Sequence, residues 1–254
     1  MKLLLQSDWQ ADNMTAPVKQ AIQQFAWKGE DVWRENVTLN WLQLQRELTY
    51  IDYTPIGTVE FVKTFAEKIG VTLPDPIHAT EVLDLEGRWH VKYTYKRALH
   101  TDEFCMYPCF VKPYNELKKF TGFVAKSDKD FDLYPEVDWD NTRLFVTEVL
   151  ENIVSEWRCY VLNGKVFACV NYAGDPLKFP NEREIMRMID YFKPQPISFS
   201  LDIALCKNGG SGDNYTITKF IEVNDAYALG YYGGDVELYT KMLNERWKEI
   251  IKQQ

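Results

Sequence analysis

Two strand-like segments in the second half of the chain carry polar side chains at positions where a buried strand normally has apolar ones. Such side chains are tolerated only if they have polar partners. Asp202 interrupts the apolar run from Phe199 to Leu205, and an isolated buried carboxylate is costly. Twenty positions later, Glu222 and Asn224 share one face of a second predicted strand, because side chains alternate along a strand. If the two strands pair as a hairpin through residues 207–215, the three side chains converge. The pattern therefore predicts an antiparallel pair of strands with a polar site on one face.

The three side chains suit a magnesium ion. Two carboxylates and an amide oxygen form a hard, oxygen-only ligand set, and magnesium in proteins binds one or two carboxylates together with substrate phosphates. The same residues also fit a solvated hairpin face or a capping acid. From the residues alone, both interpretations stay open for Asp202, Glu222 and Asn224.

Two basic residues supply the opposite charge. Lys112 lies in the run Phe-Val-Lys-Pro, and Arg158 precedes a predicted hairpin whose Asn163-Gly164 turn is the strongest short hairpin signal. A guanidinium beside phosphates neutralises charge that develops during phosphoryl transfer. A strand-end arginine can instead pair with a neighbour such as Glu156, and Arg158 considered alone favours this second interpretation.

Taken in order, these motifs resemble the ATP-grasp superfamily of carboxylate ligases, which includes glutathione synthetase and D-alanine ligases. The resemblance covers roughly residues 95–254. Within the superfamily, the chain is most similar to a little-characterised branch of bacterial and phage proteins, which residues 55–62 and 119–122 also match. It rests on Phe-Val-Lys-Pro (110–113), Glu-Val-Leu (148–150), Glu-x-Arg (156–158), Leu-Asp-Ile (201–203) and Ile-Glu-Val-Asn (221–224).

The resemblance implies a mixed α+β and α/β protein. Two α+β lobes would grip ATP, preceded by a small Rossmann-like parallel-sheet domain. The N-terminal domain would span residues 1–85, the first lobe residues 86–147, and the second lobe, with the metal site, residues 148–254.

The N-terminal region independently shows the β-α-β alternation that is typical of a parallel sheet. After a first strand at the N-terminus, a helix is predicted over residues 17–25, a strand over 48–53, and a helix over 59–69 that Gly70 ends. A closing helix is predicted over residues 235–252, with an apolar stripe that belongs to the core.

The resemblance also implies roles for the charged residues. Lys112 would contact adenine and the α-phosphate, and Arg158 would act near the γ-phosphate and the acyl-phosphate. Asp202, Glu222 and Asn224 would be ligands of one or two magnesium ions.

Two further segments would contact the nucleotide. Glu148, Val149 and Leu150 would form the hinge read by the adenine edge, and Glu151 would bind the ribose hydroxyls. A mobile phosphate-covering loop would contain catalytic Lys119 together with Thr121 and Gly122, although a surface turn is an equal alternative.

The acceptor pocket is defined less well. By the resemblance it would lie between the N-terminal domain and the loops 172–181 and 226–234. Lys178 and Arg183 are candidates to receive a substrate carboxylate, or they are simply solvated. The second loop carries three tyrosines, Tyr227, Tyr231 and Tyr232. They are interpreted either as the rim of a pocket or as part of a turn into the last helix.

The implied reaction has two steps. ATP phosphorylates a carboxylate to an acyl-phosphate, and an amine then attacks it, giving an amide, ADP and phosphate. The substrate would be a small molecule or a peptide. Two alternatives stay open: a non-catalytic ATP-binding sensor or scaffold, and a kinase acting on a small molecule. The presence of both cations and carboxylates favours catalysis, because a scaffold does not need a costly metal triad.

Composition excludes other classes of protein. The net charge of −8 argues against nonspecific nucleic-acid binding as the main role, and no uncharged stretch is long enough to span a membrane. The five cysteines lack Cys-x-x-Cys spacing, which predicts reduced, buried thiols in a cytoplasmic protein. The sequence indicates no oligomeric state.

Other catalytic motifs are missing from the sequence. There is no Gly-x-Ser-x-Gly elbow, and the glycine-rich segment 208–213 lacks the lysine of a phosphate-binding loop, so it is predicted to connect the two metal-bearing strands. The histidines are dispersed, with no helical pair for zinc. Each of the three histidines, His78, His90 and His100, is predicted to be structural or exposed.

Overall fold

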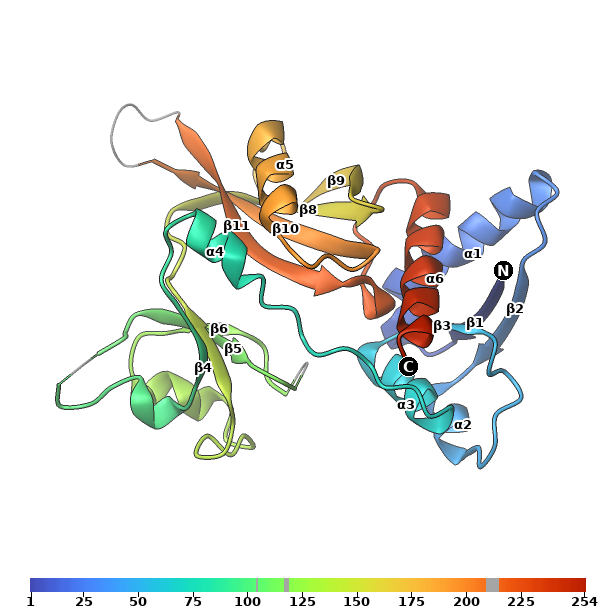
Figure 1. The fold of residues 1–254 in the computed structure, drawn as a ribbon, viewed down its shortest axis with the longest axis horizontal. Coiled ribbons are helices and arrows are strands. Elements are labelled where there is room, and N and C mark those ends of the chain that lie inside the picture. The colour runs from blue at the N-terminus through green and yellow to red at the C-terminus, as the bar shows by residue number, and fades with distance from the viewer. Residues whose placement is uncertain (104, 117–118, 209–214) are drawn as a thin grey trace.

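Three sheets organise the protein. The computed structural model describes residues 1–103, 105–116, 119–208 and 215–254. A three-stranded parallel sheet has the order β2-β1-β3, and two four-stranded antiparallel sheets have the orders β4-β7-β5-β6 and β11-β10-β8-β9 (Figure 1). The predicted architecture of a parallel-sheet domain followed by two α+β lobes is therefore confirmed. The boundaries after residues 85 and 147 stay predictions, as does the connection through residues 209–214, which lie outside the described residues.

The N-terminal domain is built around one buried strand. β1 (Lys2–Gln6) pairs in parallel with β2 (Trp33–Val37) and β3 (Thr54–Ile56), and its three leucines are fully buried. The predicted helices are confirmed and Gly70, with φ +73°, follows the last of them as its cap. The helices of this domain are α1 (Asp12–Trp27), α2 (Leu39–Leu44) and α3 (Val59–Lys68).

The strand predicted over residues 48–53 is wrong. These residues form turns, with the Tyr53 amide donating to the Tyr50 carbonyl oxygen at 3.0 Å, and the two rings pack edge to face against the core around α3. Their aromatic and β-branched character therefore serves packing of a loop. The short strand β3 follows directly, whereas β2 escaped prediction because nearly all its residues are exposed and show no apolar alternation.

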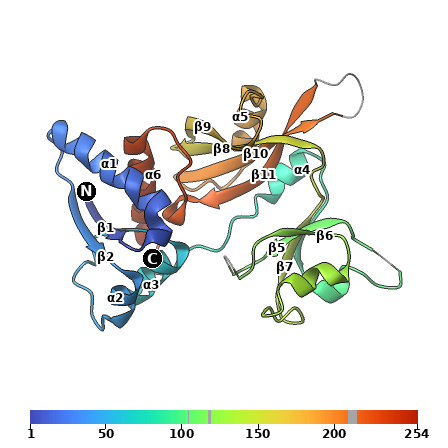
Figure 2. The same cartoon turned by 180° about the vertical axis from the view of Figure 1, so that it is seen from behind.

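The first lobe holds the sheet of β4 (His90–Thr94), β5 (Cys109–Pro113), β6 (Phe123–Ala125) and β7 (Leu144–Thr147). One face packs on a core that includes Val111, Phe131 and Val146. Phe131 belongs to a short 3-10 helix, η3 (Asp128–Leu133), and a second one, η2 (Lys96–Ala98), follows β4. The other face looks toward the second lobe across the space that the linker after α3 traverses (Figures 1 and 2).

The second lobe contains the sheet with the longest strands. Its strands are β8 (Ile153–Leu162), β9 (Lys165–Gly174), β10 (Ser198–Lys207) and β11 (Thr216–Asp225). Asn163 and Gly164 both have positive φ, 53° and 70°, which confirms the predicted tight turn between β8 and β9. α5 (Glu182–Tyr191) and α4 (Thr80–Leu85) pack on one face. The last helix covers part of the opposite face around Tyr160, and the remainder of that face builds the site.

The last helix, α6 (Val236–Lys252), joins the second lobe to the N-terminal domain. It follows the short η4 (Ala226–Ala228) and buries Tyr239, Leu243 and Trp247 against β1, β3 and α3, so the predicted apolar stripe is core. This packing fixes the parallel-sheet domain beside one end of the second-lobe sheet. Within the described residues, no helix combines the length and the apolar character needed to cross a membrane.

Candidate functional site

The three parts of the molecule meet around one cavity of about 640 Å³. The N-terminal domain and the linker to α4 form one wall, and the two lobes form the others. Among the residues that line it are Asn13, Val59, His78, Lys112, Thr121, Gly122, Arg158, Glu222, Asn224, Gly230 and Tyr232. Half of the twelve residues singled out in the sequence for a site therefore line one cavity.

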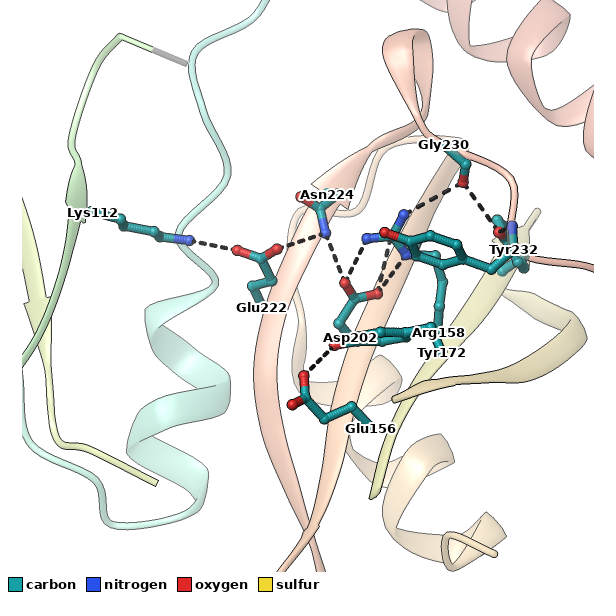
Figure 3. A network of polar contacts seen from close by, with 11 residues as sticks. Lys112, Glu156, Arg158, Tyr172, Asp202, Glu222, Asn224, Gly230 and Tyr232 are labelled. Carbon is teal, nitrogen blue, oxygen red and sulfur yellow. Dashed lines mark hydrogen bonds and ion pairs between the residues drawn. The ribbon is translucent and has the colours of Figure 1, made fainter. Parts of the chain in front are cut away.

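The sheet register brings the predicted polar residues together. β10 pairs with both β8 and β11, so that Asp202 lies opposite Arg158 on one side and opposite Glu222 on the other. Asn224 follows two positions after Glu222 and shares its face of the sheet. The predicted convergence of the three oxygen-bearing side chains is confirmed, and Arg158 joins them (Figure 3).

Arg158 and Asp202 form a buried, two-pronged ion pair. The guanidinium Nε and Nη2 donate to Oδ1 and Oδ2 at 2.8 and 2.6 Å, and the residues are 7% and 2% exposed. Burial acts to lower the pKa of Arg158, but the hydrogen bonds and the charge of Asp202 outweigh it and the pKa is raised. Glu156, the neighbour that the sequence offered as a partner, instead accepts a hydrogen bond from the Tyr172 hydroxyl at 2.8 Å.

Asp202 has further donors around it. The Ser200 hydroxyl contacts Oδ1 at 3.4 Å and the Asn224 amide nitrogen contacts Oδ2 at 3.2 Å, in addition to the guanidinium. Burial raises the pKa of Asp202, and Arg158 opposes that effect. Asp202 can serve as a metal ligand only if one of its oxygens leaves these donors.

Glu222 and Asn224 are oriented differently. The Asn224 amide nitrogen donates to both Asp202 and Glu222, at 3.2 and 3.1 Å, which turns the amide oxygen away from the two carboxylates. Oε2 of Glu222 lies 3.4 Å from the Lys112 ammonium, in an ion pair that joins the two lobes. Among the described residues no cluster of three or more His, Cys, Asp or Glu has the arrangement of a metal site. A carboxylate and an amide oxygen that share their ion with phosphates still fit magnesium.

Comparison with known proteins decides the family. The model of the ATP-grasp domain, R2K clade family 2, matches residues 86–242. The chain belongs to this ATP-grasp family. The resemblance predicted from the motifs is thereby confirmed. No curated protein matches the chain in sequence.

Solved structures show the same fold over the whole chain. D-alanine–D-alanine ligase from Bacillus anthracis complexed with ATP is 11% identical, with a TM-score of 0.55 and coverage of 100% of this chain and 98% of that chain. D-cycloserine synthetase DcsG is 10% identical, with a TM-score of 0.59 and coverage of 97% and 100%. A RimK domain ATP-grasp protein from Sphaerobacter thermophilus is 14% identical, with a TM-score of 0.53 and coverage of 99% and 100%. At such identity the likeness establishes the fold alone.

In this ATP-grasp protein, Tyr232 covers the guanidinium of Arg158. Its ring centroid lies 4.6 Å from the guanidinium carbon, and the ring also stacks on Tyr172 at 5.2 Å. The loop that carries Tyr232 is fixed by Tyr160, whose hydroxyl donates to the Gly230 carbonyl at 3.1 Å and accepts from the Tyr232 amide at 2.8 Å. The sequence suggested a pocket rim here but gave no signal that Tyr232 would stack on Arg158.

The predicted phosphate-covering loop contributes only part of its residues to the ATP-grasp cavity. Thr121 and Gly122 line it, whereas the described lining does not include Lys119, which pairs with Glu116 at 3.0 Å. A Cβ on Gly122 would lie 2.6 Å from the Phe110 ring, so a side chain there would force the ring to move. Lys118, at the start of the same loop, lies outside the described residues.

The predicted hinge connects the two ATP-grasp lobes but stands apart from the cavity. Residues 148–151 join β7 to β8, and in the described structure none of them contributes to the cavity lining. The buried Arg88 links this segment to β11, because it donates hydrogen bonds to the carbonyl oxygens of Glu148 at 3.1 Å and of Phe220 on β11 at 2.5 Å. Lys178 and Arg183 likewise contribute nothing to the described lining.

Proposed function

We propose that this protein is an ATP-dependent carboxylate–amine ligase. It activates a carboxylate as an acyl-phosphate and joins it to an amine of an amino acid or peptide, releasing ADP and phosphate. The observation that carries the proposal is the meeting of Lys112, Arg158, Glu222 and Asn224 in one cavity between two ATP-grasp lobes. The fold shared with D-alanine–D-alanine ligase supports it.

ATP would enter between the lobes. Lys112 lies on β5 and reaches across to the second lobe, where a phosphate can replace Glu222 as its partner. The backbone of Glu148, Val149 and Leu150 would meet the adenine edge, and Glu151 the ribose. Thr121 and Gly122 would cover the phosphates, and we keep Lys119 as a residue that can join them by releasing the exposed Glu116.

Magnesium would be held by Glu222 and Asn224 together with the phosphates of ATP. When bound, the ion neutralises phosphate charge and polarises the transferring group. Asp202 keeps Arg158 and Asn224 in place, and it would enter the ligand set only on opening its ion pair.

Arg158 would stabilise the transferring phosphoryl group. A substrate carboxylate oxygen attacks the γ-phosphorus and ADP leaves. The amine then attacks the acyl carbon, loses a proton and expels phosphate.

Because Asp202 holds Nε and Nη2 of Arg158, the guanidinium stays charged and keeps one orientation. Its contact from Nη1 to the Gly230 carbonyl is the longest of its hydrogen bonds, at 3.4 Å, so this nitrogen is the one that can turn to a ligand.

The decisive test is ADP release by the purified protein with Mg-ATP and pooled amino acids and short peptides. We expect acceptor-dependent ADP with the wild type and with Glu184→Ala, a change on the exposed surface of α5, and loss of that ADP with Glu222→Ala. Unchanged release by Glu222→Ala would refute the metal assignment.

The products separate the ligase from the alternatives. A ligase forms an amide only when both substrates are present, and a kinase leaves a stable phosphorylated product. ATP binding without acceptor-dependent turnover would identify a sensor and overturn the proposal.

A further inference from the structure

Two cysteine side chains meet between neighbouring strands of the second lobe. Cys159 on β8 lies directly opposite Cys169 on β9 in the antiparallel register, and their sulfur atoms are 2.8 Å apart. Both are free thiols in the structure. They are ten residues apart in the sequence, and the hairpin that turns at Asn163-Gly164 brings them together. The fold therefore creates a dithiol that the spacing of the cysteines did not reveal.

The geometry of this dithiol suits a disulfide. Opposed residues of an antiparallel pair have Cα atoms about 4.5–5.5 Å apart, and disulfides bridge Cα atoms that are about 4.4–6.8 Å apart. A sulfur–sulfur bond is about 2.05 Å long, so two sulfurs at 2.8 Å need to approach by less than about 1 Å. The paired strands therefore already hold the two thiols in position for a cross-strand bond.

The two thiols differ in their access to solvent. Cys159 is fully buried in the core between the sheet and α5, whereas Cys169 is only partly buried. The difference follows from the topology, because β9 is an edge strand of its sheet and β8 lies inside it. A small reagent in solution can therefore reach Cys169 first.

The contact between the sulfurs assigns their roles. Cys159, in the more buried position, keeps its proton and donates it in a hydrogen bond to the sulfur of Cys169. This hydrogen bond raises the pKa of Cys159 and lowers that of Cys169, although burial opposes the second effect. Because the thiolate is the nucleophile in cysteine chemistry, Cys169 is the sulfur that reacts first, and Cys159 is the one that resolves the product.

We propose that Cys159 and Cys169 are an oxidisable pair that a peroxide converts into a cross-strand disulfide. The Cys169 thiolate attacks one oxygen of hydrogen peroxide, the O–O bond breaks, and the leaving hydroxide takes up the proton that the thiol lost and becomes water. The Cys159 sulfur then attacks the sulfenic acid on Cys169. The S–S bond forms as the S–O bond breaks, and a second water leaves with the proton of Cys159. Two thiols are oxidised and one peroxide is reduced.

The disulfide would lie behind the candidate site. Arg158 and Cys159 are consecutive on β8, so their side chains point to opposite faces of the sheet, and neither cysteine contributes to the described lining of the ATP-grasp cavity. The oxidation therefore requires no bound ligand, and the inference is independent of the proposed function. In a reducing compartment such a disulfide is transient, which is the behaviour of a redox-sensing pair.

Peptide mapping of the full-length protein tests the pair. The purified protein is treated with hydrogen peroxide, its remaining thiols are blocked with iodoacetamide in urea, and it is cleaved with trypsin. Because trypsin cuts after Arg158, Lys165 and Lys178, each cysteine lies alone in its own peptide, residues 159–165 and 166–178. We expect one linked species that is lighter by two hydrogen atoms than the two peptides together, and that separates on treatment with dithiothreitol.

Three variants test the roles of the two sulfurs. Cys159→Ser removes the resolving sulfur, so Cys169 should accumulate as a sulfenic acid that dimedone traps. Cys169→Ser should leave Cys159 unmodified, because that thiol is fully buried. Cys105→Ser is the control, since it removes an exposed thiol of the first lobe and should retain the linked peptides.

The outcomes decide the proposal. Two separately alkylated peptides, at a peroxide dose that oxidises the exposed Cys105 of the same sample, would overturn it. A linked species that joins Cys105 to either cysteine, in place of the predicted link, would overturn it as well. Dimedone labelling of Cys159 in Cys169→Ser, without labelling of Cys169 in Cys159→Ser, would overturn the assigned order of attack. The result for the wild type decides the disulfide even if a serine variant does not fold.

Discussion

Two buried arginines of this protein form the same fork with an aspartate, but their surroundings differ. Arg158 holds Asp202 through Nε at 2.8 Å and Nη2 at 2.6 Å, and Arg246 on α6 holds Asp225 with the same two atoms at the same two distances. The side chains of both pairs are almost completely buried. A two-pronged ion pair alone therefore does not distinguish a functional arginine from a structural one.

The third nitrogen makes the difference. Nη1 of Arg246 donates to a second carboxylate, Glu249, at 2.6 Å, so the guanidinium is fully engaged in fixing α6 to the end of β11. Nη1 of Arg158 has only the 3.4 Å contact with Gly230, and its guanidinium lines the cavity beneath Tyr232. The comparison teaches that spare hydrogen-bonding capacity beside a cavity marks the arginine that can act on a ligand.

The largest effect should come from breaking the structural fork. Arg246→Met leaves Asp225 buried without its partner, and we expect a loss of about 3–5 kcal/mol in the free energy of unfolding. Urea unfolding of the purified protein measures it. Arg187→Met removes an exposed pair with Glu184 on α5 and serves as the control, with an expected change within about 0.5 kcal/mol. Equal losses in the two variants would refute the structural role of Arg246.

The next effect concerns turnover rather than stability. Arg158→Lys keeps a positive charge but loses the planar fork, so we expect acceptor-dependent ADP release to fall about 100-fold or more. The affinity for Mg-ATP should change much less, because the partner that we propose for Arg158 is the transferring group. Arg246→Lys is the matched variant and should keep the turnover of its folded fraction. Equal loss of affinity and turnover in Arg158→Lys would assign Arg158 to ground-state binding instead.

Much of the second lobe could be predicted because its signals are local. The Asn163-Gly164 turn and the alternation of Glu222 and Asn224 each depend on a few consecutive residues. The exact register does not, because the pairing of β10 with β11 shifts by one residue at a bulge beside Asp202. Three of the family motifs, at residues 156–158, 201–203 and 221–224, fall in the strands β8, β10 and β11. The convergence of Asp202, Glu222 and Asn224 could therefore be predicted once the two strands were paired as a hairpin.

The rest depends on contacts between distant segments. Nothing near Arg158 in the sequence names Asp202 as its partner, and the stacking of Tyr232 arises from a loop that Tyr160 anchors 70 residues away. The burial of His78 likewise requires Tyr114 and Phe145 from another domain. The strand β2 could not be predicted for a different reason, because its exposed residues show no alternation of apolar and polar side chains.

A smaller effect separates His78 from both arginine forks. The pKa of His78 is about 4 in the folded protein and near 6.5 when unfolded, so the unfolded chain binds the proton first and stability is lost as pH falls from 6.5 toward 4. The arginines keep their charge throughout this range because their pKa values are raised. Between pH 7 and pH 5 we expect the wild type to lose about 1 kcal/mol more than His78→Phe, after allowance for partial exposure. Parallel urea titrations at the two pH values measure the difference, and identical losses would contradict it.

The smallest effect tests the open face of Arg158. Tyr232→Leu removes the ring from the guanidinium, and because a cation–π contact at a partly exposed site contributes about 0.5–1 kcal/mol, turnover should fall about two- to fivefold. Tyr232→Phe keeps the ring and should retain wild-type turnover, which separates the stacking from the hydroxyl. If both variants lose activity equally, the hydroxyl of Tyr232 contacts the substrate. If neither does, Asp202 alone positions Arg158, and the two forks differ only in the cavity that one of them faces.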